Sequence, residues 1–142
     1  MQKIFSKIDS KIELAIHMKC IDVNYKTNIL TNSADPIQIN VRKIDEGFKL
    51  DPHKHLYLER NGFNYTHEIW ILIDGVLMAS IYDLDNSLLA EIEMSSGDLM
   101  LYKNGGHSFR VMNESCILYE IKNGPYFGSE LDKVNIDVND YS

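Results

Sequence analysis

The chain is poor in cysteine and in basic residues, and each shortage excludes a class of protein. Cys20 and Cys116 are the only cysteines, and because no Cys-x-x-Cys occurs, a structural zinc knuckle is not expected. We expect two free thiols in a reducing compartment, although a single disulfide is compatible with the sequence. Lysine and arginine total 14 against 21 acidic residues, a net charge of -7. This balance argues against non-specific nucleic-acid binding, which needs a basic face.

Long apolar runs are also missing. No stretch approaches the roughly 18 apolar residues of a transmembrane helix. Charges interrupt the apolar pairs near the N-terminus, so the apolar core of a signal peptide is not found. We therefore expect a cytoplasmic protein with no membrane partner. The length of 142 residues suffices for one domain with a real core.

Apolar residues alternate with polar ones at period two, which predicts strands. Over residues 37–44, Ile37, Ile39 and Val41 alternate with polar side chains. Further strands are predicted over the segment that ends in His-x-His at residue 55 and over residues 67–73, 76–82, 88–94, 99–102, 108–112 and 116–122. Asp74-Gly75 lies between two apolar runs and predicts a hairpin. The pattern favours an all-β sandwich, jelly roll or barrel.

The two ends of the chain differ from this central part, residues 37–127. Residues 1–36 are expected to form an N-terminal extension that packs on the edge of the barrel. Alternation over residues 12–18 predicts a strand there, and a short helix through Ile4, Ile8 and Ile12 is the competing interpretation. Residues 128–142 are expected to be a polar tail or a last edge strand.

Two histidines two residues apart are the strongest functional signal. His53 and His55 lie in a predicted strand, where residues i and i+2 point to the same face and can bind one divalent metal. Glu68 would face inward with Trp70, and a buried glutamate needs a partner such as a metal ion. His107 follows Gly105-Gly106, where the backbone can bend sharply. The predicted ligands are therefore His53, His55, Glu68 and His107, with zinc, iron, manganese, nickel or cobalt as candidates.

Other residues near these ligands are candidates for further roles in the site. Glu59 competes with Glu68 as a ligand and is the only nearby candidate for a catalytic proton shuttle. Arg60 is a candidate for binding an anionic substrate. Aromatic side chains are candidates for the pocket wall: Tyr57, Trp70 and Tyr102. His17 and His67 are read as ordinary residues, His67 because it alternates with Glu68.

These residues resemble the motifs of the cupins, a superfamily of jelly-roll metalloproteins. The first cupin motif, G-x5-H-x-H-x3or4-E-x6-G, is matched by Gly47, His53, His55, Glu68 and Gly75, except that twelve residues separate His55 from Glu68. The second motif is matched in order by Gly97, by Gly105 or Gly106, and by His107. The resemblance covers residues 37–127. It implies a double-stranded β-helix, the cupin jelly roll, with one divalent metal ion per chain.

The closer likeness is to small single-domain cupins that accompany genes for surface-polysaccharide or nucleotide-sugar synthesis. It implies an isomerase or epimerase that acts on a sugar or small acid, with a metal acting as a Lewis acid. The alternatives are an iron-dependent dioxygenase, a non-catalytic sugar- or metal-binding module, and a purely structural jelly roll. The expected partners are a small molecule, such as a sugar derivative, and a second copy of the chain, because exposed edge strands favour a homodimer.

Overall fold

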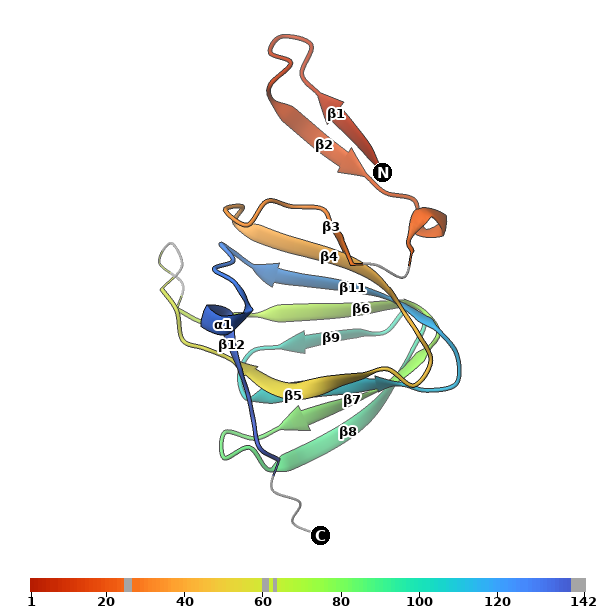
Figure 1. Ribbon diagram of the computed structural model, residues 1–142, viewed down its shortest axis with the longest axis vertical. Helices are drawn as coiled ribbons and strands as arrows, with labels where there is room; N and C mark the ends of the chain where they lie inside the picture. Colours follow the sequence, from red (N-terminus) through yellow and green to blue (C-terminus); the bar gives the residue numbers. More distant parts are fainter. Residues whose placement is uncertain (25–26, 60–61, 63, 139–142) are drawn as a thin grey trace.

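Two antiparallel sheets face each other in the computed structural model, which describes residues 1–24, 27–59, 62 and 64–138 (Figure 1). The first sheet has the order β12 (Lys133–Asn135), β5 (Lys49–His55), β10 (Gly106–Val111), β7 (Val76–Tyr82), β8 (Leu88–Ser95). The second sheet has the order β3 (Asn28–Ile29), β4 (Ile37–Ile44), β11 (Cys116–Asn123), β6 (Glu68–Asp74), β9 (Leu99–Tyr102). The predicted all-β class is confirmed.

The alternating segments form the strands that the sequence predicts. The strands over residues 37–44, 76–82 and 99–102 have the predicted bounds, and the others differ by at most two residues. In β6 the side chains of Glu68 and Trp70 are buried, as predicted, and so is that of Leu72. The hydrophobic core lies between the sheets and is formed by Ile44, Trp70, Leu72, Leu77, Ala79, Met94, Tyr102, Phe109, Val111, Cys116 and Leu118.

The predicted hairpin at Asp74-Gly75 is wrong, because the chain passes here from one sheet to the other. Strand β6 pairs with β11 and β9, whereas β7 pairs with β10 and β8. Gly75 has a φ of +89°, and a Cβ at this position would lie 2.8 Å from the Cβ of Cys116. Strands β6 and β7, which flank Asp74-Gly75, each have two other strand partners. Long-range pairing therefore overrides the local Asp-Gly signal for a hairpin.

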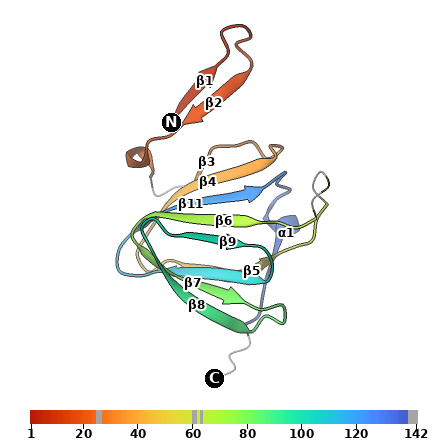
Figure 2. The ribbon, with the colours of Figure 1, turned by 180° about the vertical axis from the view of Figure 1, so that it is seen from behind.

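The N-terminal segment forms a separate hairpin of β1 (Gln2–Phe5) and β2 (Glu13–His17). It projects away from the barrel beyond β3 and β4, as both views show (Figures 1 and 2). The predicted strand is confirmed, and the competing helix is wrong. The 3₁₀ turn η1 (Cys20–Asp22) follows, and β3 pairs with β4 at the edge of the second sheet.

The C-terminal segment lies along the β5 edge of the first sheet. After the short helix α1 (Ser129–Asp132), strand β12 pairs with β5, as expected for a last edge strand. No helix in the described part of the chain is long and apolar enough to cross a membrane.

Candidate metal centre

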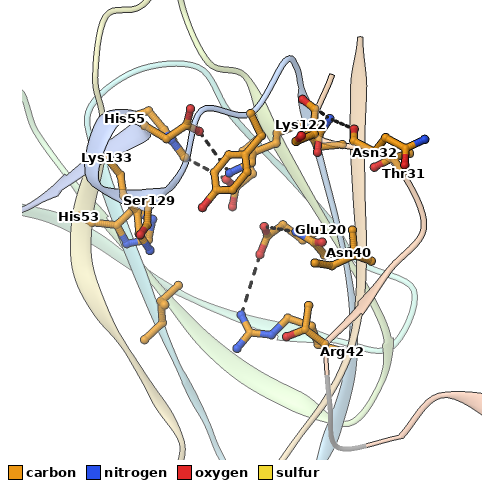
Figure 3. Close-up of a pocket in the computed structure, with 18 residues that line it drawn as sticks. Thr31, Asn32, Asn40, Arg42, His53, His55, Glu120, Lys122, Ser129 and Lys133 are labelled. Carbon is orange, nitrogen blue, oxygen red and sulfur yellow. Dashed lines mark hydrogen bonds and ion pairs between the residues drawn. The ribbon is translucent and has the colours of Figure 1, made fainter. Parts of the chain in front are cut away.

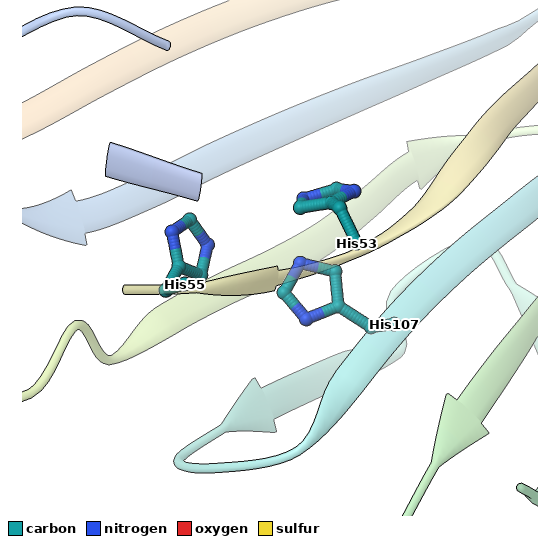
Figure 4. A group of neighbouring side chains, drawn as sticks. All are labelled: His53, His55 and His107. Carbon is teal, nitrogen blue, oxygen red and sulfur yellow. The ribbon is translucent and has the colours of Figure 1, made fainter. Parts of the chain in front are cut away.

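Strands β5 and β10 bring three imidazoles together in the barrel. The pleat of β5 places His53 and His55 on one face, and the antiparallel register pairs His107 directly with His53. The three side chains point toward one another (Figure 4). One ring nitrogen from each histidine lies within 4.8 Å of those of the other two. The cluster therefore has the spacing that a shared metal ion requires.

The electrostatics of His53 and His107 favour neutral rings, the form that binds metals. Burial lowers the pKa of His53 to about 4 and that of His107 to about 3. The Nδ1 of His53 lies 2.9 Å from the carbonyl oxygen of Asp51, to which Nδ1–H donates. This hydrogen bond fixes the ring and leaves Nε2 as the nitrogen with a free lone pair, an arrangement typical of metal-ligating histidines.

Glu68 reaches the cluster from the facing sheet. Its Oε1 accepts a hydrogen bond of 2.5 Å from the indole Nε1–H of Trp70, and its Oε2 lies 2.8 Å from Nε2 of His55. Oε1 is 3.7 Å from Nε2 of His107. Burial alone would raise the pKa of Glu68, but the hydrogen bond with His55 and the nearby His107 lower it overall. Glu68 is thus a buried carboxylate beside the cluster, and its role as fourth ligand stays a prediction.

Unpaired polar atoms support the fit of a metal ion to this cluster. Among the described residues, the buried side-chain atoms without a hydrogen-bond partner are Nδ1 of His55, Nε2 of His107 and the hydroxyl of Tyr102. Buried polar atoms are rarely left unpaired. Neutral imidazoles beside a carboxylate are a donor set that zinc, iron, manganese and nickel accept. The residues present therefore fit one divalent ion, which His53, His55 and His107 would hold.

A cavity of about 530 Å³, here the large cavity, opens onto the cluster from the space between the sheets (Figure 3). His53, His55 and Glu68 line it. Its polar wall is formed by Thr27, Thr31, Asn32, Ser33, Gln38, Asn40, Arg42, Glu120, Lys122, Ser129, Asp132 and Lys133. Four of the charged residues on this wall form two ion pairs: Arg42 lies 4.0 Å from Glu120, and Lys122 lies 3.4 Å from Asp132.

A second cavity of about 190 Å³, here the small cavity, reaches the same cluster along other residues. His55 lines both cavities, whereas His107 and Tyr102 line only the small one. The cluster therefore lies between two spaces of different size.

The remaining predicted site residues have different environments. Trp70 is fully buried beneath the cluster, where it binds Glu68 and lines neither cavity. Tyr102 is buried and its ring lies 4.3 Å from that of His107, while Tyr57 is exposed at the small cavity. Glu59 is exposed and is not among the residues that line either cavity. Arg60 lies outside the described residues.

Sequence reasoning missed the polar residues of β4 and β11 that line the large cavity. Asn40 and Arg42 alternate with apolar residues, and so do Glu120 and Lys122. Leu118 shares a face with Glu120 and belongs to the core, which was the available signal that Glu120 points inward. Asn40 Nδ2–H donates to Glu120 Oε1 over 3.1 Å.

The fold is similar to solved structures of cupins. A double-stranded β-helix protein from Klebsiella pneumoniae has a TM-score of 0.58 and 12% identity, with 79% of this chain and 84% of that chain covered. A cupin-2 domain protein from Shewanella frigidimarina has a TM-score of 0.51 and 16% identity, with 72% and 83% covered. Oxalate decarboxylase from Bacillus subtilis has a TM-score of 0.57 and 16% identity, with 72% of this chain but only 24% of that chain covered.

Comparison of the sequence itself adds no closer relative. The sequence matches no family model. It also matches no curated protein. The structural likeness establishes the cupin fold. The three-histidine cluster is a candidate metal site within it.

Proposed function

We propose that this chain is a small metal-binding cupin that holds one divalent ion and presents it to a polar small molecule. The observation that carries the proposal is the convergence of three imidazoles, with one ring nitrogen of each within 4.8 Å of those of the other two. Two of them, His53 and His55, line the large cavity. Three histidines in a half-open site are suited to an ion that keeps open positions for a ligand.

The lining of the large cavity supports a sugar derivative or a small hydroxy acid as the ligand. Hydroxyl and amide side chains supply hydrogen-bond donors and acceptors for a polyhydroxylated molecule. Three basic and three acidic side chains line the wall, namely Arg42, Lys122 and Lys133 with Glu68, Glu120 and Asp132. This balance favours a neutral or singly charged ligand over a highly charged one. Oxalate decarboxylase, with the same fold, is named for a small acid.

Isomerisation or epimerisation of such a ligand is the reaction that we favour. A bound divalent ion would polarise a carbonyl or vicinal hydroxyl oxygen. Proton transfer also needs a base, and Glu120 is better placed for it than Glu59, because Glu120 lines the large cavity. Burial, followed by the charge of Glu68, raises the pKa of Glu120. A raised carboxyl pKa suits a group that takes up and returns a proton.

Metal analysis of protein purified without added metal tests the first step. We expect close to one divalent ion per chain in the wild type and a sharp loss in His107→Ala. His67→Ala is the matched control, because His67 is exposed next to Glu68 and points away from the site. A full metal complement in His107→Ala, or none in the wild type, contradicts the proposal.

Three assays on the metal-loaded protein separate the reaction classes. Interconversion of sugar or hydroxy-acid isomers, abolished in Glu120→Gln, supports the favoured reaction. Substrate-dependent oxygen uptake with bound iron would instead assign a dioxygenase. Saturable sugar binding without turnover would assign a binding module.

A further inference from the structure

Lys133 differs from the other basic side chains of the large cavity, because it forms no ion pair with any described residue. Of the three basic residues that line this cavity, Arg42 is paired with Glu120 and Lys122 with Asp132. Two of the three acidic residues of the wall are thereby engaged. The charge of Lys133 is left without a counter-charge from either of them.

The third acidic residue of the wall, Glu68, is engaged elsewhere. Its Oε1 accepts the hydrogen bond from Trp70, and its Oε2 lies 2.8 Å from Nε2 of His55. Both oxygens therefore belong to the histidine cluster. The described wall thus offers Lys133 no free carboxylate, and the counter-charge is left to a ligand.

The pairing of β12 with β5 directs Lys133 toward the histidine cluster. Lys133 lies directly opposite His55 in the register of these strands. Opposite residues of antiparallel strands project from the same face, which is here the inward face that also carries His53. Burial is the main reason for the lowered pKa of His53, and the positive charge of Lys133 lowers it further. Figure 3 shows Lys133 on the same side of the cavity as His53 and Ser129.

The backbone on both sides of Lys133 is held against β5. The carbonyl oxygen of Asp132 accepts a hydrogen bond of 2.9 Å from the N–H of Leu56, and the N–H of Ile136 donates to the carbonyl oxygen of Pro52 over 3.0 Å. Ile136 is buried. The start of the Lys133 side chain is therefore fixed before a ligand arrives, which lowers the entropy that binding costs.

The charge of the occupied site favours an anion. The wall carries three basic and three acidic side chains, and a bound divalent ion adds positive charge to this balanced set. Lys133 is half-buried, so its ammonium interacts more strongly with a ligand charge than it would in water. One lysine is a point charge, whereas phosphate groups are typically bound by several donors or by the planar fork of arginine. A single carboxylate therefore fits better than a phosphate ester.

The rest of the cavity suits an uncharged, hydroxyl-rich part of the same molecule. Thr31 and Asn32 lie across the cavity from Lys133 (Figure 3), and both can hydrogen-bond to hydroxyl groups. The volume of about 530 Å³ falls within the range of roughly 300–1,000 Å³ that organic ligands occupy. The cavity thus has a charged end beside the cluster and a neutral polar end opposite it.

We propose that the ligand of the large cavity is a monocarboxylic sugar acid or hydroxy acid, whose carboxylate is bound by Lys133 beside the metal ion. The inference rests on the proposed function, because the ion and the acid share one cavity. It narrows the ligand from a neutral or singly charged molecule to an acid, and it assigns Lys133 as the residue that selects for the acid.

Calorimetric titration of the zinc-loaded protein with lactate and with lactamide tests the role of Lys133. The two probes have nearly the same shape and differ in the charge of one group. The wild type should bind lactate, and Lys133→Met should weaken this binding about tenfold, the effect of losing one hydrogen bond between charged groups, while lactamide binding changes little. Because zinc itself prefers a carboxylate to an amide, the deciding quantity is the change in preference between the two proteins.

Two further variants control this comparison. Lys133→Arg should keep most of the preference for lactate, because it keeps the positive charge. Lys49→Met should behave as the wild type, because Lys49 is exposed on β5 and lines neither cavity. All variants should bind zinc, and Lys133→Gln replaces Lys133→Met if that variant does not fold.

The outcomes separate this inference from the metal site. Failure of the wild type to bind zinc overturns the proposed function, and this inference with it. Zinc binding without lactate binding, an unchanged preference in Lys133→Met, or an equal loss in Lys49→Met overturns this inference alone. Tighter binding of glycerol 3-phosphate than of lactate would assign the cavity to a phosphate ester, and would also overturn it.

Discussion

Trp70→Phe tests whether the buried core beneath the cluster controls metal binding. The indole Nε1–H donates to Oε1 of Glu68 over 2.5 Å, and Trp70 is fully buried. Loss of a hydrogen bond to a charged group costs about 1.5–3 kcal/mol. The smaller ring also leaves a void, which adds about 1–2 kcal/mol, since complete removal of an aromatic side chain costs about 3–5. We therefore expect the free energy of unfolding to fall by about 2.5–5 kcal/mol.

The same substitution should weaken metal binding, because Glu68 loses one of the donors that orient it beside His55 and His107. Changes in the partners that orient a metal site typically lower affinity about 10–100-fold. Urea unfolding of the metal-free protein measures the first effect, and competition with a chelator of known affinity measures the second.

Phe109→Leu is the control for Trp70→Phe. Its ring is buried 5.1 Å from that of Trp70 and contributes only apolar contacts, so it should lower stability and leave metal affinity unchanged. The reasoning is refuted if Trp70→Phe binds metal as tightly as the wild type, or if both variants lose metal affinity equally.

The remaining predictions concern the sheet corner and the two buried carboxylates. Gly75→Ala should lower the free energy of unfolding by about 2–4 kcal/mol, because alanine is strained at a φ of +89° and its Cβ would also collide with Cys116. Gly97→Ala should lower the free energy of unfolding by only about 1–2 kcal/mol, because Gly97 has a φ of +96° but an added Cβ would meet no atom within 4 Å. Equal losses of stability for the two variants in urea unfolding would refute the role of the collision with Cys116. Glu120 has a raised pKa, so the folded state binds its proton more tightly than the unfolded state does. Wild-type stability should therefore fall relative to Glu120→Gln as pH rises above the ordinary carboxyl pKa of 4.5. Unfolding at pH 4 and pH 7 checks this, and a difference independent of pH would contradict it. Glu68→Gln should reduce the metal content measured by elemental analysis, because the carboxylate lies 2.8 Å from His55. An undiminished metal content would show that Glu68 is not a metal ligand.

Local patterns predicted the strands and half of the site. The pleat of a strand makes His53 and His55 neighbours on one face wherever the strand lies, and the same rule places Glu68 and Trp70 together. The position of His107 opposite His53 depends on the register between β10 and β5, which are separated by about fifty residues of sequence. The Gly105-Gly106-His107 segment made His107 a candidate ligand, and the cupin resemblance matched it to the second motif, but strand spacing alone did not fix this contact.

Local patterns failed where long-range pairing decides the outcome. Asp74-Gly75 has the composition of a hairpin turn, yet its two flanking strands pair in different sheets. Glu59 is close to His55 in sequence but lies on the exposed surface, while Glu120, far away in sequence, lines the large cavity. Nearness along the chain was a poor guide to nearness in the site.

The sequence by itself determined which side chains share a face, because a strand alternates whatever surrounds it. It did not determine which face points inward. In β4 and β11 the polar residues Asn40, Arg42 and Glu120 line the cavity, whereas Ile39 and Ile121 point outward. Period two is the same for both orientations, so only the packing of one sheet against the other, around a polar cavity and the histidine cluster, selects between them.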